Sequence, residues 1–343
     1  MEPLNVLVTM PFGQPLLDKL RRISPQLNVY QAKPDEADYR AADILYCFMP
    51  PRDLSRAPRL RWVQLHLAGL DVLGDHPILK TTIPLATTSG VHAASVADYT
   101  FTMLFALAHR VPRMIEWQQK GAWPPDQQQK GAWPLDQQRW PLFVPAEVRG
   151  QTLGIIGYGS IGREIARVGK TFQMRVVVSK RDISQRADVG YRLPGTGDPA
   201  GALPDQWLAP AQLADLLAQS DYVVMAAPLT RETRMMVGER ELRAMKPTAY
   251  FINVGRGATV DEAALAQALA EGRIAGAALD VFAQEPLPAA SPLYRLDNVI
   301  LSPHVSGFIP SYDDKCTDLF AENLRQTLNG QPLFNVVDRQ KGY

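Results

Sequence analysis

The chain has little of what would assign it to a specialised class of protein. Among 343 residues it carries two cysteines, Cys47 and Cys316, without a C-x-x-C spacing or neighbouring metal-ligand residues. This pattern excludes a disulfide framework, and no spacing of His, Cys, Asp and Glu predicts a metal site. We interpret both thiols as small buried side chains in a reducing compartment, which makes the cytoplasm the expected location.

Excess charge and long apolar runs are missing as well. The 36 basic and 35 acidic residues give a net charge of +1, and no block of Lys and Arg forms a nucleic-acid footprint. No apolar run approaches the length of a membrane span, and residues 4–8 resemble a first strand more than a signal peptide. We therefore expect neither nucleic acid nor a membrane among the partners.

What is present is an ordinary globular composition with one informative stretch at residues 154–182. Apolar residues make up 46% of the chain and charged residues 21%, and the length allows two domains. An apolar run at 153–156 ends in the sequence GYGSIG, and a helical apolar face and a second apolar strand follow. This order of strand, G-x-G-x-x-G, helix and strand predicts dinucleotide binding.

Each glycine of this loop has a physical task. Gly157 permits the tight turn, Gly159 lets the backbone approach a pyrophosphate, and Gly162 lets the helix pack on the strand. The free N–H groups of the helix N-terminus favour the same anion. We expect the whole loop to contact the cofactor, namely Gly157, Tyr158, Gly159, Ser160, Ile161 and Gly162.

Alternating strands and helices predict an α/β protein with two parallel sheets. Strands are expected at 4–9, 27–31, 43–48, 62–66 and 82–87, then at 153–156, 175–179, 221–226, 249–253, 276–281 and 298–301. A long helix is expected at 92–110, and a last helix at about 311–329 follows the completed second sheet. Its simplest place is back on the first domain, with a cleft between the two domains.

Two segments do not fit a regular α/β unit. Residues 119–128, QKGAWPPDQQ, recur as 129–138 with Leu135 in place of Pro125. A period of ten residues is too short for a solenoid, so a duplication that lengthened a surface loop is the simpler interpretation, against a functional repeat. Residues 190–210 are rich in Gly and Pro and follow the second strand of the nucleotide unit, near the expected adenosine end.

Three groups of residues at strand ends can carry chemistry, since ligands bind there in such folds. Arg256 lies between two glycines and offers a guanidinium fork for a carboxylate. Asp280 and Glu285 follow the next strand. His304 follows the last, and histidine can supply the proton that ketone reduction requires near neutral pH. Of the other histidines, His92 at a helix start is the reserve candidate.

Taken together, GYGSIG, NVGRG, ALDVFAQEP and SPHVSG resemble the D-2-hydroxyacid dehydrogenase family over essentially the whole chain. The resemblance implies two Rossmann-like doubly wound domains, one flavodoxin-like and one dinucleotide-binding. It divides the chain into a discontinuous substrate domain, 1–110 with 309–343, and a nucleotide domain, 111–308. It also implies a homodimer, formed through an arm at about 112–150 that contains the duplication.

The resemblance further implies NAD(P)H-dependent reduction of a small 2-oxo acid, of the glyoxylate or hydroxypyruvate kind, to the D-2-hydroxy acid. His304 is then the acid/base, Glu285 orients and charges it, and Arg256 binds the carboxylate and carbonyl. Ala68 and Gly69 join Arg256 and His304 as substrate-binding residues, and Asp280 contacts the nicotinamide. The remaining expected cofactor contacts are Ser179, Lys180, Arg181, Ala227, Pro228, Thr233, Val254 and Gly255.

The end of the second nucleotide strand departs from the common family pattern. Many members have an Asp there for the ribose hydroxyls, whereas this chain has Ser179, Lys180 and Arg181. Two cations attract a 2′-phosphate, so the sequence favours NADP(H) over NAD(H), although Asp182 keeps NAD(H) open.

Two other functions remain open from the sequence. One is an oxidoreductase acting on another small anion, such as phosphite. The other is a nucleotide-sensing binding protein, similar to the corepressors of this family. The intact set of Arg256, Glu285 and His304 favours catalysis.

Overall fold

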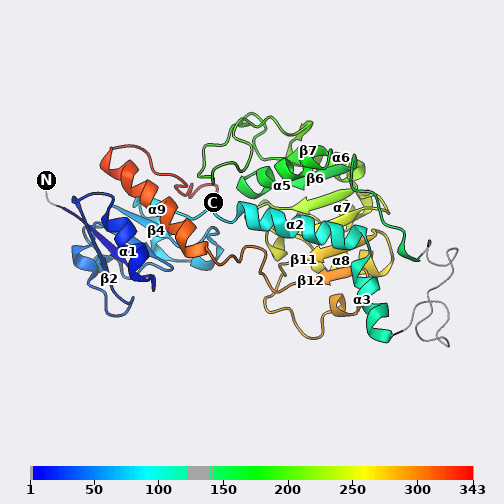
Figure 1. Cartoon of the computed structure of the whole chain (residues 1–343), viewed down its shortest axis with the longest axis horizontal. Helices are drawn as coiled ribbons and strands as arrows, with labels where there is room; N and C mark the ends of the chain where they lie inside the picture. The colour runs from blue at the N-terminus through cyan, green and yellow to red at the C-terminus, as the bar shows by residue number, and fades with distance from the viewer. Residues whose placement is uncertain (1–2, 122–139, 141, 343) are drawn as a thin grey trace. The chain divides into compact units, whose positions relative to one another are not determined.

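The computed structural model describes residues 3–121, 140 and 142–342, which form two compact α/β units (Figure 1). The first unit comprises residues 1–92, 189–195 and 308–343, and the second comprises 93–188 and 196–307. The strands are β1 (Leu4–Val8), β2 (Leu27–Gln31), β3 (Ile44–Cys47), β4 (Trp62–Leu65), β5 (Leu85–Ala86), β6 (Thr152–Ile156), β7 (Arg175–Ser179), β8 (Gln206–Leu208), β9 (Tyr222–Met225), β10 (Tyr250–Asn253), β11 (Gly276–Leu279) and β12 (Val299–Leu301). The helices are α1 (Gln14–Arg21), α2 (Ala93–Ala108), α3 (Val111–Lys120), α5 (Ser160–Thr171), α6 (Leu213–Gln219), α7 (Glu239–Ala244), α8 (Glu262–Ala270) and α9 (Tyr312–Leu328).

The first unit is built on a five-stranded parallel sheet with the order β2-β1-β3-β4-β5. This is the flavodoxin-like order that the family resemblance implies. Alternate residues of β1 enter different cores: Val6 and Val8 pack with α1 and α9, whereas Leu7 packs on the other face. Burial on both faces explains why these strands are almost continuously apolar.

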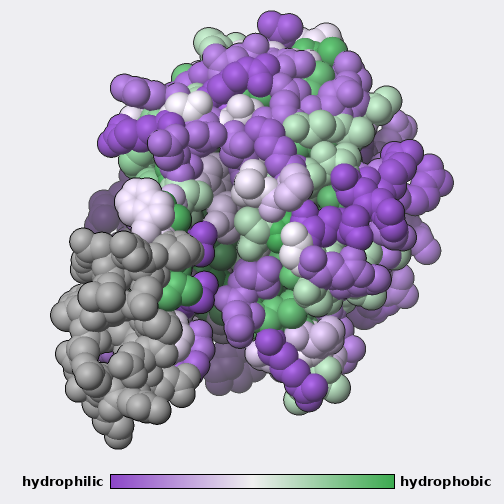
Figure 2. All heavy atoms as spheres, turned by 90° about the vertical axis from the view of Figure 1, so that its right-hand side faces the viewer, coloured by the Kyte–Doolittle hydropathy of each residue, from purple (hydrophilic) through white to green (hydrophobic). Residues whose placement is uncertain are grey.

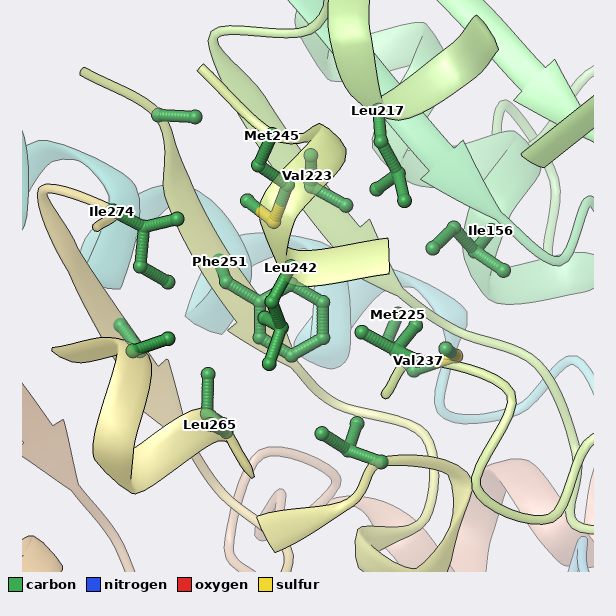
Figure 3. Packing of buried hydrophobic residues seen from close by; sticks show 14 of the residues in the cluster. Ile156, Leu217, Val223, Met225, Val237, Leu242, Met245, Phe251, Leu265 and Ile274 are labelled. Atoms are coloured by element: carbon green, nitrogen blue, oxygen red, sulfur yellow. The ribbon is translucent and has the colours of Figure 1, made fainter. Parts of the chain in front are cut away.

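The second unit contains a seven-stranded parallel sheet with the order β12-β11-β10-β9-β6-β7-β8. The strand order reverses at β6, where doubly wound sheets bind dinucleotides. Helices α6, α7 and α8 bury Leu217, Leu242 and Leu265 against one face (Figure 3). Helices α2 and α5 cover the other face through Phe101 and Ile165. The predicted fold class is therefore confirmed.

The expected division of the chain needs a correction at the long helix. We predicted the boundary after residue 110, but the structure divides the chain between His92 and Ala93. The physical reason is that α2 packs on α5, β10 and β11, and buries Leu104 and Leu107 in the core of the second unit. The C-terminal residues 308–343, including α9, belong to the first unit.

The Gly- and Pro-rich segment after β7 is more ordered than its composition indicates. Residues 206–208 form β8, which pairs with β7 at the edge of the sheet. Residues 189–195 belong to the first unit, where the backbone N–H of Tyr191 donates to Oδ1 of Asn335 over 3.0 Å. The ten-residue duplication falls almost entirely on 122–139, outside the described residues.

Asn323 on α9 joins the last helix to the chain on either side of it. Its side chain is fully buried and donates to Oε1 of Gln64 over 3.0 Å and to the carbonyl of Phe334 over 3.3 Å. Its own oxygen accepts from the N–H of Phe334 over 2.7 Å. The amide thereby connects a strand, the helix and the C-terminal tail.

We predict that Asn323→Leu destabilises the first unit by about 3 kcal/mol, because Gln64 and Phe334 lose buried partners. Hydrogen exchange of the amides in β4 and α9 measures this loss unit by unit. Arg325→Leu, which removes only an exposed ion pair on the same helix, is the control and should change protection little. Unchanged exchange in Asn323→Leu would contradict the role of this amide.

Candidate active site

The glycine-rich loop between β6 and α5 has the close approaches that its motif requires. Gly157 has a φ of +97°, and a Cβ there would lie 2.6 Å from the backbone nitrogen of Ala227. A Cβ on Gly162 would lie 2.2 Å from the carbonyl oxygen of Gly157. No atom lies within 4 Å of a Cβ built on Gly159. Gly157 and Gly162 shape the turn, while Gly159 leaves open space over the N-terminus of α5.

The tyrosine of this loop has a structural role as well. The Tyr158 ring is buried, and its hydroxyl donates to Oδ2 of Asp198 over 2.8 Å. Burial and this carboxylate raise the pKa of the phenol, so the hydroxyl remains a donor. The side chain therefore supports the segment after β7, which leaves the main chain of Tyr158 for the predicted cofactor contact.

The predicted cofactor residues Ser179, Lys180 and Arg181 lie at the end of β7. Ser179 is buried, and the Lys180 ammonium donates to the carbonyl of Gln185. Burial and the nearby Arg163 lower the pKa of Lys180. The Arg181 guanidinium lies 3.7 Å from the Glu232 carboxylate. The two cations are thus placed beside the strand that follows the glycine-rich loop.

The predicted cofactor residues on the other side of β6 follow β9 and β10. Thr233 donates to the carbonyl of Pro228 over 2.6 Å and accepts from the N–H of Thr230, which closes the loop after β9. A Cβ on Gly255 would lie 2.8 Å from the carbonyl oxygen of Ala227. The loops after β9 and β10 therefore touch, which brings Ala227 and Pro228 close to Val254 and Gly255.

Arg256 follows β10 in a loop that approaches the next one closely. A Cβ on Gly257 would lie only 1.8 Å from the carbonyl carbon of Phe282, so no side chain fits at this position. The guanidinium is partly buried, and its Nη1 donates to the carbonyl of Gly255 over 2.9 Å. This places a cation at the carboxyl end of β10, next to the loop that carries Glu285.

Glu285 and His304 form the predicted pair. Oε2 of Glu285 lies 2.8 Å from Nδ1 of His304, and its Oε1 accepts from the N–H of Phe282 over 3.0 Å. The carboxylate therefore orients the ring. The two side chains are 37% and 46% exposed, so a ligand can reach the other ring nitrogen.

A cavity of about 500 Å³ adjoins this pair. Besides His304 and Glu285 it is lined mainly by apolar side chains, among them Phe282, Leu287, Tyr294 and Leu301. A few polar side chains in the wall of a mainly apolar cavity are an arrangement that many small-molecule sites share.

The loop that carries His304 depends on Asp280. This side chain is fully buried, and its carboxylate accepts from the hydroxyl of Ser302 and from the N–H groups of Val305 and Ser306, at 2.6, 2.9 and 2.9 Å. The structure thus gives Asp280 a structural role, and its contact with a nicotinamide stays a prediction.

The remaining predicted substrate residues lie in the first unit. Ala68 and Gly69 occupy the loop after β4, where the carbonyl of Leu67 accepts from the N–H of Thr88 over 2.9 Å. The reserve candidate His92 also belongs to this unit, and its ring stacks on Tyr312 with centroids 4.7 Å apart. Stacking is an ordinary structural role for this histidine.

Sequence reasoning missed three residues that support the site. Asn253 is buried at the end of β10 and accepts from the N–H of Gly255 over 3.1 Å. Ser302 bonds Asp280, and the Tyr99 hydroxyl of α2 bonds Ser302. Asn253 and Ser302 adjoin motifs that were recognised, so proximity could have indicated them. Tyr99 lies 203 residues from Ser302 and carries no such signal.

Within residues 3–121, 140 and 142–342, no group of three His, Cys, Asp or Glu side chains is placed to hold a metal ion. No helix in this part of the chain is long and apolar enough to cross a membrane.

Comparison with known proteins agrees with the geometry. Residues 101–306 match the family described as D-isomer specific 2-hydroxyacid dehydrogenase, NAD binding domain. A glyoxylate reductase of Aeropyrum pernix is 36% identical over 324 residues, which cover 91% of this chain and 88% of the relative. A glyoxylate reductase of Thermococcus gammatolerans is 37% identical over 291 residues, which cover 83% and 78%.

Solved structures extend the likeness to the whole chain. A D-isomer specific 2-hydroxyacid dehydrogenase of Xanthobacter autotrophicus, in complex with NADPH and MES, has a TM-score of 0.77 and 28% identity and covers 100% of both chains. An NADPH-dependent glyoxylate/hydroxypyruvate reductase of Sinorhizobium meliloti, in complex with NADP and sulfate, has a TM-score of 0.73 and 25% identity and covers 99% of this chain and 100% of its own.

The two doubly wound units, the glycine-rich loop and the histidine–glutamate pair define an oxidoreductase that uses a nicotinamide dinucleotide and reduces 2-oxo acids. The coverage and identity of the relatives make the assignment more specific. The chain belongs to the D-isomer-specific 2-hydroxyacid dehydrogenase family.

We predict that His304→Asn lowers kcat by about a hundredfold or more, because a general acid contributes about 10²–10⁴ to the rate. Glu285→Gln should lower kcat by about tenfold or more, since the ring loses the carboxylate that orients it. Cofactor binding, followed by fluorescence titration, should stay within about twofold of wild type in both variants.

The control is His109→Asn, the same change at an exposed histidine just after α2, which should keep full activity. If His304→Asn also kept wild-type turnover, His304 would not be the acid/base.

Proposed function

We propose that the protein reduces a small 2-oxo acid of the glyoxylate or hydroxypyruvate kind to its D-2-hydroxy acid, with NADPH preferred as reductant. The observation that carries this proposal is the His304–Glu285 pair, which lines a cavity at the carboxyl end of a doubly wound sheet with a glycine-rich first loop. The names of the similar proteins, glyoxylate reductase and glyoxylate/hydroxypyruvate reductase, support the substrate class.

The residues divide the reaction between them. A nicotinamide cofactor, when bound, would supply the hydride that the carbonyl carbon of the substrate accepts. His304 donates a proton to the carbonyl oxygen as negative charge develops there, and Glu285 orients the ring for this transfer. Arg256 binds the substrate carboxylate and polarises the carbonyl. The backbone N–H groups of Ala68 and Gly69, in the first unit, stay the expected donors to a substrate carboxylate. Release of the hydroxy acid leaves His304 neutral, ready to take up a proton from water.

The charges at the end of β7 support the preference for NADPH. Lys180 and Arg181 are cations that directly follow β7, the strand whose end holds the adenosine ribose in such folds. Asp182, the next residue along the chain, is engaged in its own loop, where Oδ1 accepts from the N–H and hydroxyl of Ser184 at 3.0 and 2.6 Å. A carboxylate used in this way is a poor acceptor for ribose hydroxyls, which weakens the case for NADH.

We further propose a cytoplasmic homodimer that uses the region around α3. This helix buries none of its own side chains, and Met114 and Ile115 are 36% and 48% exposed. The described surface on the side of the molecule shown in Figure 2 is otherwise largely hydrophilic, with hydrophobic residues in small areas between. Apolar side chains on such a helix favour contact with a second copy.

The function is tested by the loss of NADPH or NADH absorbance with glyoxylate, hydroxypyruvate, pyruvate and bulkier 2-oxo acids. Turnover of the small acids, faster with NADPH, is the expected result. Turnover of phosphite with an oxidised cofactor, or tight cofactor binding without turnover of any acid, would instead favour one of the two other functions considered above.

We predict that the double variant Lys180→Ala, Arg181→Ala weakens NADPH binding by about ten- to a hundredfold and NADH binding by less than about threefold. The reason is that only NADPH carries the 2′-phosphate, and charge-assisted hydrogen bonds contribute about 1.5–3 kcal/mol. Dissociation constants from calorimetry measure both cofactors.

The control double variant is Lys33→Ala, Arg40→Ala, which removes the same charges from exposed positions of the first unit. Equal weakening of both cofactors in the β7 variant would show that neither cation recognises the 2′-phosphate.

A further inference from the structure

His304 occupies a backbone conformation that needs support. Its φ is +54°, in the left-handed region that residues with a side chain rarely adopt. Such a residue keeps this conformation only where its surroundings hold it. One support is the hydrogen bond from its N–H to the carbonyl of Asp280 over 2.8 Å.

The Asp280 carboxylate holds the chain on both sides of His304. Before the histidine it accepts from the hydroxyl of Ser302 over 2.6 Å. After it, the N–H groups of Val305 and Ser306 donate over 2.9 Å each. The side chain is fully buried, where hydrogen bonds to a charged acceptor are strong and costly to lose. These bonds determine the turn from which the His304 ring projects.

A second hydrogen bond links Ser302 to helix α2. The single hydroxyl proton of Ser302 goes to Asp280, so its oxygen can only accept from other groups. The Tyr99 hydroxyl lies within hydrogen-bonding distance of this oxygen. Burial and the nearby Asp280 raise the pKa of Tyr99 to about 12, so the phenol keeps its proton and donates it.

Helix α2, which carries Tyr99, is firmly packed in the second unit. It packs on β10, β11 and α5, and contributes Phe101 and Leu104 to the buried core. Tyr99 is itself partly buried against that core, so its ring has little freedom. The Tyr99 hydroxyl therefore has a definite position relative to the strands that carry the site.

We infer that Tyr99 is a positioning residue for the acid/base: through Ser302 and Asp280, it sets the turn that aims His304 at the substrate. Glu285 contacts one nitrogen of the His304 ring directly. Tyr99 acts instead through Ser302, on the backbone of the turn that carries His304. This inference rests on the proposed role of His304 and adds a residue that touches neither substrate nor cofactor.

The expected signature is a loss in kcat without a loss in binding. A small displacement of a catalytic group can cost up to about a hundredfold in rate. Tyr99→Phe removes the hydroxyl that bonds Ser302, but it leaves Ser302 and Asp280 in place. We therefore expect a partial loss, with kcat falling by about five- to thirtyfold. KM for the 2-oxo acid and the Kd of NADPH should stay within about twofold of wild type.

The experiment measures kcat, KM and cofactor Kd for Tyr99→Phe, Ser302→Ala and the double variant. If the two residues act in one chain, the double variant is no slower than Ser302→Ala. Ser302→Thr, which keeps a hydroxyl, should restore most of the rate. This conservative variant also keeps the test valid should Ser302→Ala fold poorly.

The matched control is Tyr222→Phe. Tyr222 is buried in the same unit, and its hydroxyl donates to the carbonyl of Glu147 over 2.8 Å. This variant loses one buried tyrosine hydrogen bond, which should lower thermal stability but leave kcat unchanged. If Tyr99→Phe behaved in the same way, Tyr99 would be merely structural and the inference would be overturned.

Comparison with His304→Asn separates this inference from the proposed function. An inactive His304→Asn beside a fully active Tyr99→Phe overturns only the role of Tyr99. An active His304→Asn overturns the acid/base assignment itself, and with it the reason for positioning that ring.

Discussion

The parallel register of β10, β11 and β12 is the constraint on which the site depends. The three strands pair in phase, Asn253 beside Leu279 and Leu279 beside Leu301, so all of them end at the same edge. Arg256, Glu285 and His304 each follow one of these ends. A slip of one strand would turn its side chains to the other face and separate the groups. The apolar cores on both faces prevent such a slip, because alternate residues of each strand belong to different cores.

Around this edge, the loops are set by contacts that allow no side chain. Gly257 lies against the backbone of Phe282, and Gly255 lies against that of Ala227. These contacts link the loops after β9, β10 and β11 into one surface. Precise placement of reacting groups requires this kind of backbone support, because side chains on free loops lose rate through misplacement. The buried carboxylate of Asp280 gives the loop after β12 equivalent support.

The segment after β7 connects the glycine-rich loop with the cations that follow the strand. Arg163 of α5 is almost fully buried and donates to the carbonyls of Asp198 and Arg186 at 2.6 and 2.7 Å. Tyr158 of the glycine-rich loop donates to the carboxylate of Asp198. Lys180 donates to a carbonyl of the same segment. The composition of this segment indicates an irregular loop. In the structure, hydrogen bonds hold it to the end of β7, to the glycine-rich loop and to α5.

The sequence alone determined the elements and the chemical groups of this protein. Apolar runs of period two or 3.6, ended by glycine or a capping residue, are local signals. They located the βαβ unit and the capped helix α8, where Asp261 accepts from the N–H of Ala264 over 3.1 Å. Motifs of a few consecutive residues also singled out Arg256, Glu285 and His304 as candidates, because each lies at a predicted strand end or in the loop that follows it.

Only the tertiary structure decided where α2 belongs and what supports His304. A helix with an apolar side can pack on either domain, and its sequence does not say which, so the boundary after residue 110 was wrong. Tyr99 and Ser302 lie far apart in the chain, and Asp280 looks like any carboxylate at a strand end. Their hydrogen bonds depend on distance in space, which a linear pattern of residue types does not contain.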